Sequence, residues 1–149
     1  MSFSIIEQLM LRDLQKCIAE VNAYTSDEHL WSVPQGVLNS GGTLALHMAG
    51  NLQHFMGHIL GGTDYLRDRE REFNVRNLTR AEVITEMEKA IIAVKHAFTQ
   101  ITGTDPNALF PDTLFGPDKT VAEILHMLLT HLSYHLGQLN YHRRITTIS

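Results

Sequence analysis

The chain has 149 residues, of which 44% are hydrophobic and 19% charged, and its formal net charge is −4. This composition is typical of one globular domain, so we expect residues 1–149 to form a single domain with one core. The mildly acidic chain lacks the basic surface that nucleic acids and anionic membranes attract. A signal peptide is not evident, and no apolar run reaches the length of about 18 residues that a membrane span needs. Because the single cysteine, Cys17, cannot form an intramolecular disulfide, we expect a cytoplasmic protein.

Four segments of the chain carry apolar residues at spacings of three and four, which predicts four helices. The segments span about residues 4–24, 42–60, 79–101 and 120–144. Three of them begin with a Ser or Thr followed three residues later by Glu, the pattern of a capping box. These pairs are Ser4 with Glu7, Thr79 with Glu82, and Thr120 with Glu123. Cys17 falls in the apolar stripe of the first segment, where a buried structural thiol is the expected role.

Three long connections separate these segments, at residues 25–41, 63–78 and 102–119. No alternating run of strand length appears, so we predict an all-α protein, a four-helix bundle with at least one crossover connection. The middle connection contains a run of charged residues at 67–72, which we expect to be a solvated helix end.

Histidine is the unusual feature of the composition, with nine in 149 residues. His131 and His135 lie one turn apart on the fourth predicted helix, on a face that the core residues Ile124 and Leu128 share within about 40°. The second predicted helix carries a polar stripe over three turns. Its members, which lie within about 40° of one line, are His47, Asn51, His54 and His58.

Histidines on a core-facing stripe need partners, because burying an unpaired imidazole is costly. Two imidazoles at positions i and i+4 can bind one divalent ion, with a third ligand from a facing helix. Three protein ligands leave a coordination position open, which is typical of a catalytic rather than a structural site. Residues 132–134 contain no glutamate, so the metalloprotease HExxH pattern is absent. Hydrogen-bonded core histidines without a metal are the competing interpretation.

Periodicity does not decide which residue of the second helix is the third ligand. His47, His54 and His58 share one face, so all three stay open at this point. Asn51 faces the same way, where it would either support a ligand or make an interhelical hydrogen bond. Gln138 follows His135 by three residues and would either orient a ligand or cap a neighbouring loop.

Two stretches of the chain resemble the motifs of DinB-like (DinB/YfiT-like) proteins. THLSYHLGQLNYHRR, residues 130–144, resembles the fourth-helix signature of the form NHxxYHRGQ. LHMAGNLQHF, residues 46–55, resembles the second-helix motif, an HLA-type start followed by an aromatic residue. The resemblance covers the whole chain in length and motif order. It implies a four-helix bundle of up-down-down-up topology, a homodimer, and a site for zinc or nickel whose ligands fall on His47, His131 and His135.

Three positions depart from the family pattern: Thr130 replaces the usual asparagine, Leu136 the usual arginine, and Phe55 a common tryptophan. None of these changes removes a proposed metal ligand. Because Leu136 stands where the family usually has arginine, we expect the contacts with a substrate or partner to differ. The family includes transferases that use low-molecular-weight thiols such as bacillithiol or mycothiol, and a maleylpyruvate isomerase. The resemblance therefore implies a metal-dependent thiol transferase or hydrolase acting on a small molecule. The alternative is a non-catalytic, metal-stabilised stress or interaction protein.

Overall fold

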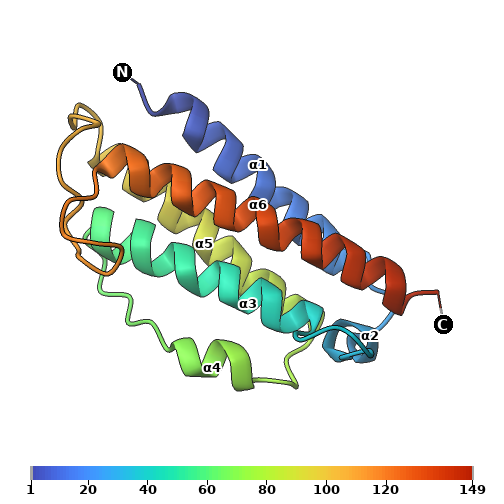
Figure 1. The fold of residues 1–149 in the computed structure, drawn as a ribbon. Helices are drawn as coiled ribbons and strands as arrows, with labels where there is room; N and C mark the ends of the chain where they lie inside the picture. Colours follow the sequence, from blue (N-terminus) through green and yellow to red (C-terminus); the bar gives the residue numbers. More distant parts are fainter. Residues whose placement is uncertain (1, 149) are drawn as a thin grey trace.

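The computed structural model describes residues 2–148, and its regular elements are helices (Figure 1). The predicted all-α class is therefore confirmed. The elements are α1 (Ser4–Asn22), α2 (Asp27–Trp31), α3 (Gly41–Leu52), the π-helix η1 (Gln53–Leu60), α4 (Arg69–Asn74), α5 (Arg80–Gln100) and α6 (Val121–Thr146). Within this part of the chain, the β contacts amount to an isolated bridge between Leu109 and Thr120. None of the described helices has the length and hydropathy needed to cross a membrane.

Four long helical segments build the core. Helix α1 packs against α5 and α6, and α3 packs against the same two helices from the other side. In Figure 1, α1 and α6 run in one direction, while α3 and α5 run in the opposite direction. The α3–α6 contact brings the histidine-bearing faces of the second and fourth predicted helices together.

The helix starts follow the capping pattern at two of the three predicted positions. Both threonine capping boxes are confirmed, at Thr79 with Glu82 and at Thr120 with Glu123. The predicted box at Ser4 and Glu7 is wrong, because Phe3 is the N-cap residue and its side chain makes no capping hydrogen bond. Ser4 already has helical geometry, so its hydroxyl is one position too late to accept from the free N–H groups of the first turn.

Two of the predicted loops contain short helices that periodicity did not reveal. Helices α2 and α4 have five and six residues, which is too short for an apolar period to repeat. The Asp68 side chain caps α4 by accepting from the backbone N–H of Arg71. The charged run at 67–72 is solvated only in part: residues 68–71 are exposed as expected, but α4 packs against α3 and buries Glu72.

The second predicted helix changes its winding after Leu52. Residues Gln53–Leu60 form a π-helix, and its last turn closes with an i→i+5 bond from the Gly61 N–H to the Met56 carbonyl, 2.8 Å long. Gly57 faces α5 so closely that an added Cβ would lie 3.1 Å from the Cβ of Ala93. π-Helical turns are rare in proteins, and those that occur are often found at functional sites. The side chains of this segment are therefore candidates for a functional role.

His142 joins the end of α6 to the N-terminal part of the chain. Its ring is 2% exposed, its Nε2–H donates to the carbonyl of Ser32 over 2.9 Å, and its Nδ1 accepts from the Tyr24 hydroxyl over 2.6 Å. The bond from the Tyr24 hydroxyl requires the neutral ring, since an imidazolium has no acceptor for the tyrosine. Gly41 leaves room for this pair, because a Cβ at this position would overlap the Tyr24 hydroxyl.

The first prediction concerns the pH dependence of stability. Burial lowers the pKa of His142 below its ordinary value, whereas the unfolded chain binds a proton there at about pH 6.5. The unfolded state thus binds more protons as pH falls below about 6.5, and the free energy of unfolding decreases. Urea unfolding with a chelator present, at pH 7.5 and 5.5, should show a smaller loss for His142→Gln than for wild type. Equal losses would contradict this role of His142.

Candidate metal centre

Three histidines from two helices meet at the α3–α6 contact. His47 comes from α3, and His131 and His135 come from successive turns of α6. The Nε2 atom of His131 lies 3.1 Å from that of His47 and 3.0 Å from that of His135. One nitrogen from each ring lies within 4.8 Å of the other two. The structure thus brings together the three residues that the sequence and the resemblance favour, while metal binding itself stays a prediction.

Two of these rings are held from behind by acceptors. The Nδ1 of His47 lies 3.2 Å from Oε1 of Glu72, and the Nδ1 of His135 lies 2.7 Å from Oε1 of Gln138. Because both partners are oxygens, each Nδ1–H donates, and in the neutral ring the Nε2 then carries a lone pair. Both lone pairs face Nε2 of His131, which has at most one proton to share. A cation at the centre satisfies all three nitrogens, so this donor set fits a divalent metal.

The electrostatic setting keeps the α6 ligands neutral. Burial, followed by the neighbouring His135 and His47, lowers the pKa of His131 to about 4. Burial also lowers the pKa of His135 below its ordinary value. At neutral pH neither ring is an imidazolium, so each has one nitrogen with a lone pair for a metal, which favours metal binding.

Glu72 is the residue that orients His47. It lies on α4, is 6% exposed, and forms a two-point ion pair with Arg67 at 2.9 and 3.0 Å. Burial alone would raise the pKa of Glu72, but hydrogen bonds from His47 and Arg67 outweigh this effect, and the pKa lies below its ordinary value. The carboxylate is therefore charged at neutral pH, which strengthens its bond to His47.

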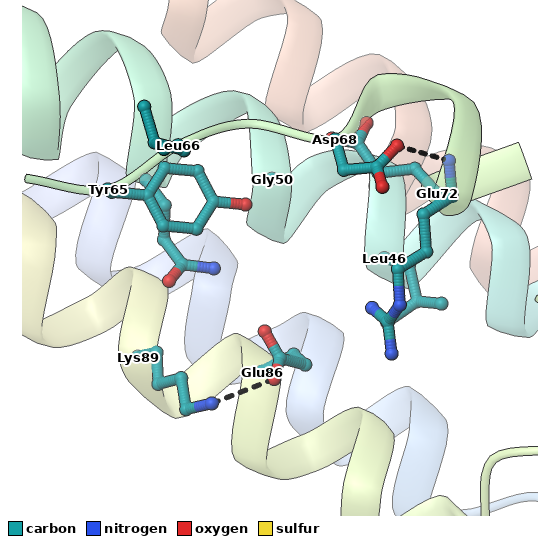
Figure 2. A pocket seen from close by; sticks show the side chains of 10 residues that line it. Leu46, Gly50, Tyr65, Leu66, Asp68, Glu72, Glu86 and Lys89 are labelled. Atoms are coloured by element: carbon teal, nitrogen blue, oxygen red, sulfur yellow. Dashed lines mark hydrogen bonds and ion pairs between the residues drawn. The ribbon is translucent and has the colours of Figure 1, made fainter.

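Gly50 explains how Glu72 reaches the histidine. A Cβ on Gly50 would overlap the Glu72 carboxylate, so only glycine lets α4 bring this side chain across α3. Figure 2 shows both residues on the wall of a polar cavity of about 360 Å³ that also contains Tyr65, Glu86 and Lys89. None of the three histidines lines this cavity, so Glu72 separates it from the histidine cluster.

Sequence reasoning missed Glu72 but included Gln138. Nothing in the charged run distinguishes Glu72 from Glu70, since six helical residues carry no apolar period and the contact with His47 spans 25 positions. Gln138 stands three residues after His135 on one helix, and this spacing predicts neighbouring side chains. Its hydrogen bond to His135 favours the ligand-orienting role over the capping of a loop.

The other histidines take separate roles. His54 and His58, the alternatives to His47, lie outside the cluster. Four histidines have a single hydrogen-bond partner each: His29 bonds Thr25, His58 the carbonyl of Thr63, His96 the carbonyl of Gly61, and His126 the carbonyl of Ala122. His142 has the two partners given above. The ring of His54 has no hydrogen bond within the described part of the chain.

Cys17 has the structural role expected of it. Its thiol is buried, and its Sγ lies 3.6 Å from Sδ of Met48. Burial, followed by the charges of Asp13 and Glu20, raises the pKa of the thiol well above its ordinary value. Since the thiolate is the nucleophile, this cysteine is unreactive in the folded protein.

Comparison with known proteins gives a family but no characterised relative. A family model described as "Protein of unknown function (DUF1572)" matches residues 4–147. No curated protein matches the chain, and no solved structure matches it. The match spans all the helices and includes every residue of the histidine cluster.

The second prediction tests the support of His47 by Glu72. Gly50→Ala should displace the Glu72 carboxylate, and the loss of such an outer partner lowers metal affinity by about 10–100-fold. Gly137→Ala on α6 is the matched control, because an added Cβ there meets nothing within 4 Å. Affinities for zinc and nickel are measured by competition with a chromophoric chelator. If folded Gly50→Ala binds these metals as tightly as wild type, Glu72 does not support the site.

Proposed function

We propose that this chain, which belongs to the DUF1572 family of proteins of unknown function, is an enzyme that binds one divalent metal ion. The proposed ligands are His47, His131 and His135. The observation that carries the proposal is the convergence of three imidazole nitrogens, with the rear nitrogens of two rings held by Glu72 and Gln138. Imidazole ligands suit several transition metals, and we propose zinc or nickel.

The arrangement of the helices supports a DinB-like relationship. In Figure 1 the first and last long segments run in one direction and the two between them in the other, which supports the proposed up-down-down-up topology. The two histidine motifs lie on the second and fourth of these segments. We therefore keep the DinB/YfiT-like four-helix bundle as part of the proposal. The homodimer stays a prediction, since the structure contains one chain.

An enzymatic role is supported by the number and exposure of the ligands. Structural metal sites are normally closed by four protein ligands, whereas catalytic sites have three and an open position. His131 and His135 are only partly buried, so a small molecule can approach from solvent. Cys17, buried under α3 with a raised pKa, offers no fourth ligand at this site.

The proposed reaction is the transfer of a low-molecular-weight thiol to an electrophile. A bound divalent cation supplies Lewis acidity, which stabilises a thiolate near neutral pH. The thiol proton goes to solvent, the sulfur forms a bond to the electrophilic carbon, and the leaving group departs with its electron pair. Glu72 and Gln138 keep His47 and His135 in position for this chemistry.

A cavity next to Gln138 gives room for the electrophile. Its volume is about 330 Å³, and α6 contributes Gln138, Tyr141 and Ile145 to its wall. Leu44 of α3 and the loop at 36–39 complete it. Apolar side chains with a few polar groups are the usual lining of small-molecule sites. None of the three histidines of the cluster lines this cavity, and Gln138, which lines it and bonds His135, is the proposed link between a molecule bound there and the histidine cluster.

The third prediction is thiol transfer. Metal-loaded protein should accelerate the reaction of bacillithiol with monochlorobimane, in which a C–S bond forms and chloride leaves. We expect at least about a tenfold higher rate than with His131→Ala, which corresponds to about 1.4 kcal/mol of barrier. His126→Ala is the control, because this exposed ring bonds only a carbonyl of its own helix.

Two outcomes would contradict the enzyme proposal. The first is equal rates for wild type and His131→Ala with bacillithiol, cysteine and glutathione alike. The second is a protein whose melting temperature falls on chelation while none of these thiols changes it. That pattern indicates a metal that only stabilises the fold, which is the non-catalytic alternative.

A further inference from the structure

Two buried polar atoms on the chain segment that follows His47 have no partner among residues 2–148. The Oδ1 atom of Asn51 and the Nδ1 atom of His54 are both buried and make no hydrogen bond within this part of the chain. Asn51 as a whole is 7% exposed. A buried acceptor without a donor costs about 1–3 kcal/mol, so such atoms in a folded protein call for an explanation.

Both atoms lie on the helix face that carries the proposed ligand His47. Asn51 is one turn beyond His47 on α3, about 6 Å further along the axis, and His54 follows on the π-helix η1. The first member of this polar stripe faces the α6 histidines, and the next two are unpaired. Each of the other eight histidines has a hydrogen-bond partner on at least one ring nitrogen. The lack of a partner within the described residues is therefore specific to His54.

The surroundings of His54 favour a hydrogen-bond donor as the missing partner. Burial, followed by the nearby charge of Arg67, lowers the pKa of His54, so its ring is neutral at pH 7. The Arg67 charge is balanced by its two-point pair with Glu72, and the carboxylate of Asp112 also acts on His54. The Oδ1 of Asn51 is an acceptor, and the Nδ1 of His54 is one in the tautomer that carries its proton on Nε2, which is the tautomer that the inference uses. Two buried acceptors on one face can be satisfied by one group with several N–H donors.

We propose that Asn51 and His54 form a subsite for a primary amine on the molecule that binds at the histidine cluster. The amine N–H groups donate to Oδ1 of Asn51 and Nδ1 of His54. One helical turn separates Asn51 from His47. In the proposed ligand, the amine nitrogen is therefore two or three bonds away from the atom that binds at the histidine cluster. With the proposed thiol reaction, on which this inference rests, the ligand class is an aminothiol.

The fourth prediction begins with stability in the absence of ligand. Asn51→Leu replaces an unpaired buried acceptor by an apolar side chain of similar size, so the free energy of unfolding should stay equal or rise. Asn140→Leu is the matched control, since Nδ2 of Asn140 donates to Glu20 over 2.7 Å and its loss should lower stability. Urea unfolding with a chelator measures both. A clear loss of stability in Asn51→Leu would show a structural partner and overturn the subsite.

Ligand binding provides the second measurement. Cysteamine and 1-propanethiol have similar sizes, but only cysteamine carries an amine. Calorimetry with zinc-loaded wild type should show a preference for cysteamine, and Asn51→Leu should reduce this preference about tenfold, as expected for a hydrogen bond from a charged donor. Because the two thiols also differ in acidity, the informative quantity is the change in preference between the variants. His54→Leu should act in the same direction, and His126→Leu should leave the preference unchanged.

The outcomes separate this inference from the proposed function. An equal preference in wild type and Asn51→Leu means that the two acceptors hold only water, which overturns the subsite and leaves thiol binding intact. If neither thiol binds the zinc-loaded protein, the thiol function and the subsite both fail. Asn51→Leu with wild-type zinc content, retained stability and a reduced preference supports the subsite.

Discussion

The convergence of three Nε2 atoms is the constraint on which the rest of the structure depends. His131 lies 3.1 and 3.0 Å from the nitrogens of His47 and His135, and two of the three lone pairs are fixed by the donation of Nδ1–H elsewhere. Such an arrangement is repulsive unless a proton or a cation occupies its centre. The low pKa of His131 makes the proton a poor occupant at neutral pH, and a divalent cation a suitable one.

Much of the architecture serves to hold this arrangement. The antiparallel contact of α3 with α6 brings the rings together, and α4 adds the Glu72 carboxylate through the space that Gly50 leaves. Arg67 then fixes that carboxylate from the opposite side. Further along α3 the chain continues as a π-helix, and at this end Oδ1 of Asn51 and Nδ1 of His54 have no hydrogen-bond partner within the described residues. The site is thus tightly supported behind His47, while two buried polar atoms further along the same helix face are left unsatisfied.

The sequence predicts the helical class and two of the three proposed ligands on local grounds. His131 and His135 are one turn apart on a core-facing stripe, and this spacing holds in any regular helix. His47 could not be separated from His54 and His58 in this way, because all three share a line, so its selection came from the resemblance. Glu72 was not predictable, since its approach depends on a contact between a six-residue helix and a glycine 22 positions away. The π-helix was also missed, because the apolar spacing of residues 42–60 predicts one continuous helix and does not reveal a change of winding after Leu52.

Metal content is the most direct test of the central claim. Protein purified without a histidine tag is incubated with zinc or nickel, freed of excess ion, and examined by elemental analysis. The account predicts one ion per chain in wild type and in His126→Ala, and a large loss in His47→Ala, His131→Ala and His135→Ala, because two imidazoles compete poorly with water. His54→Ala and His58→Ala should keep most of the metal. A wild-type protein that holds neither zinc nor nickel would contradict the account and leave the three histidines as hydrogen-bonded groups of a helical core.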